Sequence, residues 1–276
     1  KGRAMCEVFG AYGWAEGASM MKGLLDHMLV RGINHFVPHA FSPVFPNPDC
    51  PPHFGAEGRD PQFSGFTKLM RYGNQVSHLL CGAKHEADVA IVYHAELEWC
   101  NGASSMLTQV PAKILYEQQI DFDILPFDAL ASANVEDGLL RVHEETYKAL
   151  LVPGCAALPE ALLAILQRLE NAGLPVWFVE ERPKEADFGR VVSQACLAEE
   201  AKKFATVHIA PANPLLRVYR AQREADWIYM LVNESTVHCY EGEITVPEAR
   251  ECLRLDLLLD RKSKLRVHDG KVSLSL

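Results

Sequence analysis

The fold is decided by residues 4–41, which read AMCEVFGAYGWAEGASMMKGLLDHMLVRGINHFVPHAF. The apolar run at 4–10 predicts a buried strand, and a loop rich in glycine and aromatic residues follows it. Apolar residues at three- and four-residue spacing from Met20 to Leu29 predict a helix, and Gly32 stands where a C-terminal cap belongs. A second strand is predicted from Ile33 to Phe41. This order indicates a βαβ unit, and therefore parallel strands joined by a right-handed crossover.

Residues 42–66 are rich in proline and glycine and have little periodicity, which predicts a long irregular loop. Loops of this length are uncommon inside compact domains and often line functional sites. A helix is predicted to follow, from about Phe66 to Leu80.

From Ala87 onward, apolar strands alternate with amphipathic helices. Strands are predicted at 88–94, 122–125, 149–152 and 176–179, with helices at about 105–119 and 159–172 and Gly173 as a cap. This alternation predicts a doubly wound, flavodoxin-like α/β sheet. The last part of the chain changes character, and β-branched and aromatic runs predict short antiparallel strands at 216–219, 227–232 and 243–246.

Charge and composition exclude several classes of protein. The formal net charge of −9 argues against nucleic acid as a partner, because binding a phosphate backbone needs clustered Lys and Arg. No apolar run reaches eighteen residues and no signal peptide is recognisable, so a soluble, non-membrane protein is predicted. The eight scattered cysteines form no C-x-x-C pair, which suits reduced thiols in the cytoplasm and predicts no structural metal. No nucleotide-binding motif is present, and no cofactor is expected.

The segments at 6–14, 31–34 and 37–41 resemble strands seven and eight of glycoside hydrolase barrels, and the likeness is closest to the α-L-rhamnosidase-like and β-galactosidase-like clans. Residues 89–96 and 123–126 resemble the class I glutamine amidotransferase-like domain that follows such barrels, and residues 229–235 resemble the start of a β-sandwich. The resemblance implies three regions: the C-terminal part of a (β/α)₈ barrel at 1–86, a flavodoxin-like α/β domain at 87–206 and a β-rich domain at 207–276.

The resemblance implies a fragment of a glycoside hydrolase that acts on plant or bacterial carbohydrates. Glycosidic bonds are usually cleaved by two carboxyl groups, and barrel active sites lie at the carboxyl ends of strands. Glu7 is therefore the candidate catalytic residue, and the resemblance suggests the nucleophile or base. The acid usually comes from an earlier strand that this sequence lacks, so the isolated fragment is expected to be inactive. The alternative is that Glu7 is a structural, salt-bridged or capping carboxylate.

Four further residues are candidates for binding the carbohydrate. Tyr12 and Trp14 offer flat faces that can stack on a sugar ring, although packing within the loop is an equal alternative. His39 lies near the end of the second strand, where it can bind a sugar hydroxyl or serve as a core histidine bonded to a carbonyl. Glu96 follows the first strand of the α/β domain, either as a wall of the active site or as a solvated loop charge.

Two other hypotheses stay open at this stage. The first is a non-catalytic assembly module with an amidotransferase-like fold, which predicts a fully paired first strand and covered apolar faces around Ile33 to Phe41. The second is a Cys hydrolase, which needs an exposed Cys155 of low pKa beside a histidine. A buried strand so close to the first residue favours a truncated barrel. Half a barrel would expose a large apolar face, so association into homo-oligomers is expected.

Overall fold

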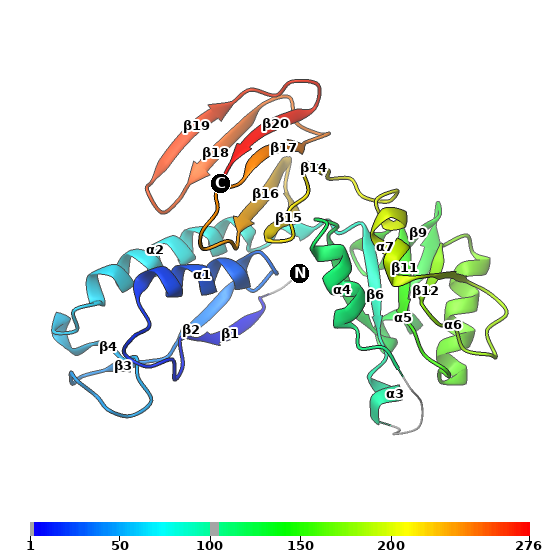
Figure 1. Cartoon of the computed structure of the whole chain (residues 1–276), viewed down its shortest axis with the longest axis horizontal. Helices are drawn as coiled ribbons and strands as arrows, with labels where there is room; N and C mark the ends of the chain where they lie inside the picture. The colour runs from blue at the N-terminus through cyan, green and yellow to red at the C-terminus, as the bar shows by residue number, and fades with distance from the viewer. Residues whose placement is uncertain (1–2, 100–104) are drawn as a thin grey trace. The chain divides into compact units, whose positions relative to one another are not determined.

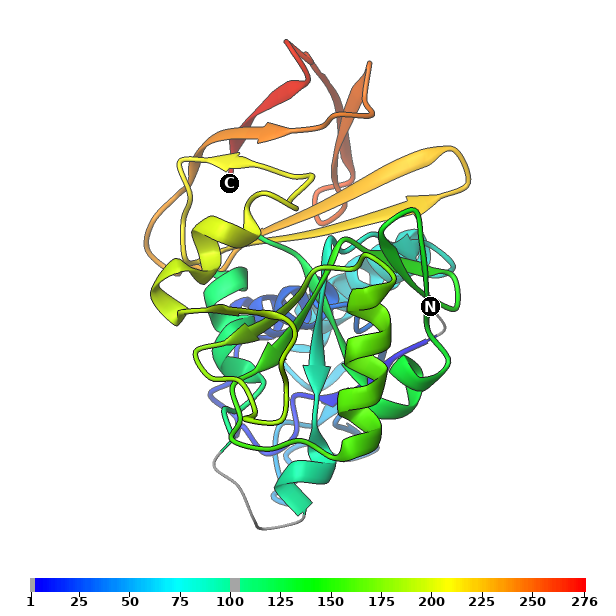
Figure 2. The same cartoon turned by 90° about the vertical axis from the view of Figure 1, so that its right-hand side faces the viewer.

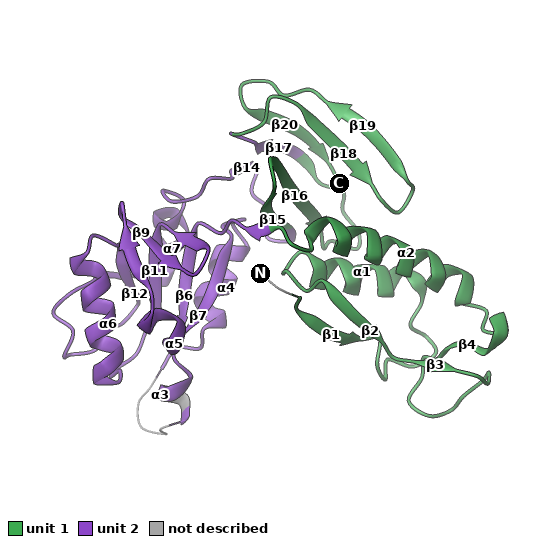
Figure 3. Cartoon of the chain, turned by 180° about the vertical axis from the view of Figure 1, so that it is seen from behind, with its two compact units in different colours: residues 1–83, 217–241, 248–276 green, residues 84–216, 242–247 purple. Residues whose placement is uncertain are grey.

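The computed structural model describes residues 3–99 and 105–276 (Figure 1). They fall into two compact mixed α/β units (Figure 3). Unit 1 comprises Lys1–Ala83, Arg217–Glu241 and Glu248–Leu276, and unit 2 comprises Lys84–Leu216 and Gly242–Pro247. Among the described residues, no helix has both the length and the apolar character needed to cross a membrane. The sequence predicted three regions, at 1–86, 87–206 and 207–276, from the type of fold in each. The two units are defined by compactness instead, so the division into three regions stays a prediction.

Unit 1 opens with the expected strand, helix and strand. Its elements in chain order are β1 (Met5–Val8), α1 (Ala18–Leu29), β2 (His35–Pro38), β3 (Phe41–Ser42), β4 (Phe54–Gly55), the 3₁₀ helix η1 (Ala56–Gly58), α2 (Phe63–Leu80), β15 (Leu216–Arg223), β16 (Asp226–Asn233), β18 (Cys252–Asp256), β19 (Arg261–Leu265) and β20 (Lys271–Ser275). Strands β1 and β2 pair in parallel, with Met5 opposite His35 and Glu7 opposite Val37. The prediction of a parallel βαβ unit is confirmed.

The C-terminal cap of α1 is the predicted Gly32. Its φ of +87° lies in the left-handed region, and the N–H of Ile33 donates to the carbonyl of Met28 at 3.1 Å. This six-to-one hydrogen bond is the Schellman motif, which satisfies a carbonyl at the end of the helix. A Cβ atom at Gly32 would lie 3.5 Å from the ring of Tyr219, an ordinary van der Waals distance, so the positive φ alone favours glycine here.

The core of unit 1 lies between α1 and α2. Met21, Leu25 and Leu29 on α1 are fully buried, and they belong to one cluster with Phe66 and Leu69 of α2. Within this core the carboxylate of Asp26 accepts a hydrogen bond from the Tyr72 hydroxyl at 2.6 Å and also pairs with Lys22.

The segment expected to be an irregular loop contains short regular pieces. Strand β3 pairs in parallel with β4, and α2 begins at Phe63, three residues before the predicted start. Phe54 is buried, stacks on Phe66 at 4.0 Å between ring centroids and contacts Phe9 edge-on at 6.3 Å. These aromatic contacts fix the loop to the core, and no sequence periodicity reports them.

Unit 2 is built on a five-stranded parallel sheet. Its elements are β5 (Lys84–His85), β6 (Val89–Tyr93), α3 (Ala95–Trp99), α4 (Gln109–Tyr116), β7 (Phe122–Pro126), α5 (Phe127–Ala131), β8 (Asn134–Glu136), β9 (Leu139–Val142), β10 (Glu145–Tyr147), β11 (Ala149–Pro153), α6 (Glu160–Asn171), β12 (Val176–Val179), β13 (Arg190–Val192), α7 (Gln194–Ala201), β14 (Ile209–Ala210) and β17 (Glu241–Thr245). The order of the parallel strands is β13-β12-β11-β6-β7. The four strands predicted from apolar runs are β6, β7, β11 and β12.

Both faces of this sheet are covered (Figure 2). One face packs against α5 and α6 in a cluster that includes Leu150 and Leu166, and the other packs against α4 and α7 in a cluster that includes Ile91 and Leu197. Alternate residues of a strand point to opposite faces, which explains why the strands read as continuous apolar runs.

Candidate functional site

Glu7 lies on the uncovered face of the β1–β2 pair. The opposite face carries Val8, which is buried, and Phe36, which packs against the same core. Glu7 is exposed, and its neighbours on the uncovered face include Met5 and Val37, which are 62% and 46% exposed. The carboxylate therefore stands near the carboxyl end of a parallel strand, on the side away from α1.

The backbone that follows Glu7 adopts an unusual conformation. Phe9 and Ala11 have φ values of 72° and 62°, in the left-handed region that non-glycine residues seldom enter. Gly10 lies between them, and a Cβ atom there would be 3.3 Å from Oε1 of Glu7 and 3.6 Å from Cβ of His39. Such backbone strain clusters at functional sites, and here the side chains of Glu7 and His39 both lie close to a residue without a side chain.

His39 continues the second strand beside this turn. Its backbone N–H donates to the carbonyl of Val8 at 2.8 Å, and its ring Nδ1 is buried without a hydrogen-bond partner among the described residues. The ring centroid lies 5.4 Å from that of His53, whose Nε2 contacts the carbonyl of Asp49. His53 was not predicted. The only signal was its place in the Pro-rich segment, because that segment must fold before the two rings meet.

Of the two aromatic residues predicted to bind the carbohydrate, Trp14 packs against other rings and Tyr12 is exposed. Trp14 is half-buried, contacts Phe45 edge-on at 5.3 Å and lies 6.4 Å from the His53 ring. Tyr12 is 53% exposed. Glu7, His39 and Trp14 are therefore linked through Gly10 and His53, and Tyr12 is on the same loop with its ring free for contact.

Glu16, on the loop between β1 and α1, is a second carboxyl group that sequence reasoning missed. It is 1% exposed, and burial raises its pKa to about 7. Neither carboxyl oxygen has a hydrogen-bond partner within residues 3–99 and 105–276. An isolated buried carboxylate is costly, so this group requires a proton or a counter-charge.

In unit 2, the polar residues after β6 and β11 differ in accessibility. Glu96 is half-exposed on α3, whereas His94 is fully buried. Cys155 is also fully buried, and burial, followed by the charge of Glu181, raises the pKa of its thiol to about 12. The thiol is therefore neutral near pH 7, and the conditions that a Cys hydrolase needs are not met.

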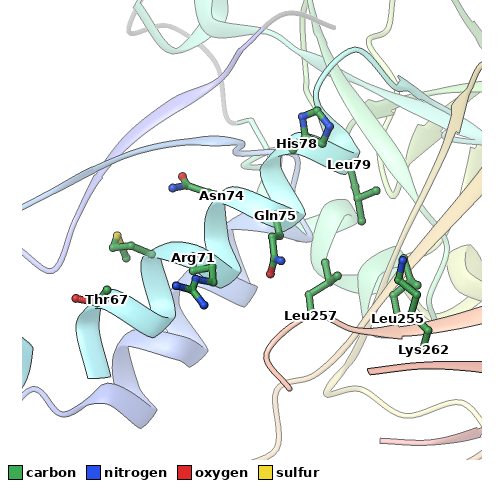
Figure 4. A pocket seen from close by; sticks show the side chains of 10 residues that line it. Thr67, Arg71, Asn74, Gln75, His78, Leu79, Leu255, Leu257 and Lys262 are labelled. Atoms are coloured by element: carbon green, nitrogen blue, oxygen red, sulfur yellow. The ribbon is translucent and has the colours of Figure 1, made fainter. Parts of the chain in front are cut away.

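A groove of about 660 Å³ runs along α2 in unit 1 (Figure 4). One wall is the α2 face that carries Arg71 and His78, and the other carries Leu255, Leu257 and Lys262. The Glu7 site shares no residue with this lining. Within the described part of the chain, no group of three or more His, Cys, Asp or Glu side chains is arranged to hold a metal ion.

The solved structures that share this fold include a rhamnosidase, an exo-carrageenase and an α-L-fucosidase. The rhamnosidase from Novosphingobium sp. PP1Y matches 97% of the chain with a TM-score of 0.67 at 17% identity, and the chain covers 29% of that protein. The apo exo-carrageenase GH42 from Bacteroides ovatus has a TM-score of 0.55 at 11% identity, with 96% of this chain and 40% of that one covered. The α-L-fucosidase isoenzyme 2 from Paenibacillus thiaminolyticus has a TM-score of 0.56 at 11% identity, and the match covers 99% of this chain and 58% of that one.

The chain thus spans less than two thirds of each of these three proteins. No family model matches the sequence, and no curated protein matches it either. The fold is one that occurs within glycoside hydrolases, as the resemblance of residues 6–41 and 89–126 led us to expect.

Proposed function

We propose that this chain is part of a glycoside hydrolase and that Glu7 is its catalytic nucleophile or base. The observation that carries the proposal is the position of the Glu7 carboxylate, beside Gly10 and His39 at the carboxyl end of a parallel strand. In (β/α)₈ barrels the helices lie outside, the opposite strand face points inward, and catalytic groups stand at the carboxyl ends. Glu7 meets each of these conditions if β1 and β2 are adjacent barrel strands.

The exposed face of β1 and β2 supports the same assignment. Parallel sheets are ordinarily covered on both faces, yet Met5 on β1 and Val37 on β2 are 62% and 46% exposed. Phe41, which follows on β3 at the end of the segment from Ile33 to Phe41, is 65% exposed. Among the described residues β1 pairs with β2 alone. The assembly-module hypothesis expected full pairing and covered faces, so these observations favour the barrel. Further strands of the same barrel would cover this face and supply the acid.

In this proposal unit 2 is a flavodoxin-like, amidotransferase-like domain without amidotransferase chemistry. Its five strands, numbered along the chain, lie in the order 2-1-3-4-5 that is typical of flavodoxin-like sheets. The buried, neutral thiol of Cys155 supports the loss of the Cys chemistry.

The chemistry follows from the groups at the site. The Glu7 carboxylate attacks the anomeric carbon or takes a proton from the attacking water, while a partner carboxylic acid protonates the leaving oxygen. His39 and the faces of Tyr12 and Trp14 bind hydroxyls and the sugar ring. Glu96 lies on α3 of unit 2, and its role in carbohydrate binding stays a prediction that is separate from the Glu7 site.

The test is hydrolysis of aryl glycosides by the protein as its gene encodes it. The panel contains α-L-rhamnosides, α-L-fucosides and β-D-galactosides, and the configuration of the first-formed sugar is followed by NMR. We expect hydrolysis of at least one of these glycosides. The configuration at the anomeric carbon should be retained if Glu7 is the nucleophile and inverted if Glu7 is the base. A folded protein that cleaves no glycoside in a broad panel would contradict the proposal.

A further inference from the structure

Each wall of the groove along α2 combines a cationic side chain with leucine. Arg71, Gln75 and Leu79 recur at four-residue spacing and therefore lie on one side of the helix. Figure 4 shows Gln75 and Leu79 reaching toward Leu257 and Leu255 on the opposite wall. Both walls belong to unit 1, so the groove lies within one compact part of the chain.

The second wall is one face of the hairpin formed by β18 and β19. Leu253 stands opposite Lys264, and Leu255 stands opposite Lys262. Side chains that are directly opposite in an antiparallel pair point to the same face, and residues two apart along a strand share that face. Both leucines are exposed. This face therefore presents two leucines beside two lysines, and it continues the lining of the groove.

The charge at the groove is positive, although the chain as a whole has a formal net charge of −9. Helix α2 contains no Asp or Glu, and neither does the lining of the groove among the described residues. Asp256 follows Leu255 on β18 but points to the other face of the hairpin, where it stands opposite Arg261. In the part of the chain that the structure describes, neither Arg71 nor Lys262 pairs with a carboxylate. An anion that enters the groove would meet both cations without an opposing charge.

These walls discriminate between classes of ligand. The lining that the structure describes has no aromatic ring on which a neutral sugar could stack. A membrane presents a broad surface, whereas a groove between a helix and a hairpin accepts a narrow one. A second copy docked about a twofold axis would bring Arg71 and Lys262 against their own counterparts, which like-charge repulsion disfavours.

We propose that the groove binds a partner protein through an acidic, leucine-rich peptide segment. The carboxylates of such a segment pair with Arg71 and Lys262, and its aliphatic side chains contact Leu79, Leu255 and Leu257. The apolar contacts supply affinity, and the charges select the partner and speed its association. The groove shares no residue with the Glu7 site, so the inference stands independently of the proposed glycosidase function.

The test measures the binding of synthetic peptides of equal length by calorimetry, with the protein as its gene encodes it. The first peptide alternates pairs of Glu and Leu, the second replaces each Glu with Lys, and the third replaces each Leu with Ser. We expect the first peptide alone to bind, and to bind more weakly as salt is added, because salt screens the attraction between charges. No binding of the first peptide, or equally tight binding of the second, would overturn the proposal.

Charge reversal in the protein locates the site. Arg71→Glu and Lys262→Glu should each weaken binding of the Glu–Leu peptide by at least about tenfold, because each replaces an attraction with a repulsion. The matched control is Lys68→Glu, which reverses an exposed charge on α2 outside the lining and should leave binding unchanged. All three side chains are exposed, and melting temperatures check the folding of each variant. Wild-type binding by the two folded groove variants would overturn the proposal.

The apolar contribution is tested on the hairpin wall. Leu255→Ser removes an exposed leucine from the lining and should weaken binding, whereas Leu258→Ser removes an exposed leucine outside the lining and should not. Equal effects of the two substitutions would contradict a specific groove.

The same charge variants identify any other occupant. Sedimentation measures self-association, and vesicles that contain phosphatidylserine measure membrane binding. Self-association that Arg71→Glu abolishes, in a protein that does not bind the peptide, would assign the groove to a second copy and overturn the proposal. Vesicle binding with the same dependence on Arg71, again without peptide binding, would assign it to a membrane and overturn the proposal as well.

Discussion

The two units each contain parallel strands, but the strands are covered in different ways. In unit 2 the sheet has helices on both faces, and Ile91 and Leu151 are fully buried. In unit 1 the β1–β2 pair has α1 on one face and exposes Met5, Glu7 and Val37 on the other. A covered sheet contributes stability. An uncovered face with a carboxylate at its carboxyl end contributes little stability, and its residues are available for another role.

The largest effect is expected in the covered sheet. Ile91→Ala removes a fully buried side chain from β6 and leaves a cavity, so it should lower the free energy of unfolding by about 4 kcal/mol. Urea denaturation measures the loss. A loss below about 1 kcal/mol would mean that this face of the sheet is not tightly packed.

A buried charge in unit 2 gives the next largest effect. His85 loses solvation on burial, but Asp121 and Asp123 outweigh this and raise its pKa from 6.5 to about 9. The histidine is charged in the folded state, so its contribution is fully present below pH 6.5 and is lost as the pH rises through about 9. The shift corresponds to about 3 kcal/mol.

The pH dependence is checked by urea denaturation of the wild type between pH 6 and 10. The control is His85→Gln, which cannot take up a proton and should lose most of the decrease between pH 7 and 9. An unchanged pH dependence in the variant would show that another group is responsible.

Unit 1 should depend on its helices more than on its sheet. Tyr72→Phe removes the hydroxyl that donates to Asp26 at 2.6 Å, while Lys22 still pairs with that carboxylate. We expect a loss of about 1 kcal/mol in thermal or urea unfolding, as for a typical hydrogen bond to a charged group that keeps another partner. An unchanged free energy of unfolding would show that this hydrogen bond does not stabilise unit 1.

The smallest effect is expected on the uncovered face. Val37→Ala changes a side chain that is 46% exposed, and the free energy of unfolding of this 276-residue chain should change by less than about 0.5 kcal/mol. The comparison with Ile91→Ala uses truncation to the same residue in two parallel sheets. A loss as large as that of Ile91→Ala would contradict the distinction between them.

The sequence predicted the parts of the fold that depend on local patterns. Continuous apolar runs located β6 and β11, and Gly32 and Gly173 marked the ends of α1 and α6 because their positive φ values suit glycine. The antiparallel sheet of β8, β9 and β10 was missed because its strands are only three or four residues long. Asp137 and Gly138, both with positive φ, were an available turn signal.

The candidate site was predictable only where it follows a strand. Glu7 and His39 stand near the ends of β1 and β2, and their proximity follows from the parallel register. His53 and Glu16 could not be found in this way, because their positions depend on how residues 42–62 fold back. The packing of β15 and β16 residues such as Tyr219 and Val232 with α1 likewise joins distant segments, and no local pattern reports it.

The most direct test of the account replaces the Glu7 carboxylate with its amide. Glu7→Gln and the exposed control Glu57→Gln are compared by kcat/KM on the best aryl glycoside, with melting temperature as a check on folding. Because Glu7 is exposed, neither change should alter stability by more than about 0.5 kcal/mol. We predict that Glu7→Gln lowers kcat/KM by about 10³-fold or more while Glu57→Gln leaves it unchanged. A folded Glu7→Gln protein with wild-type kcat/KM would contradict the account.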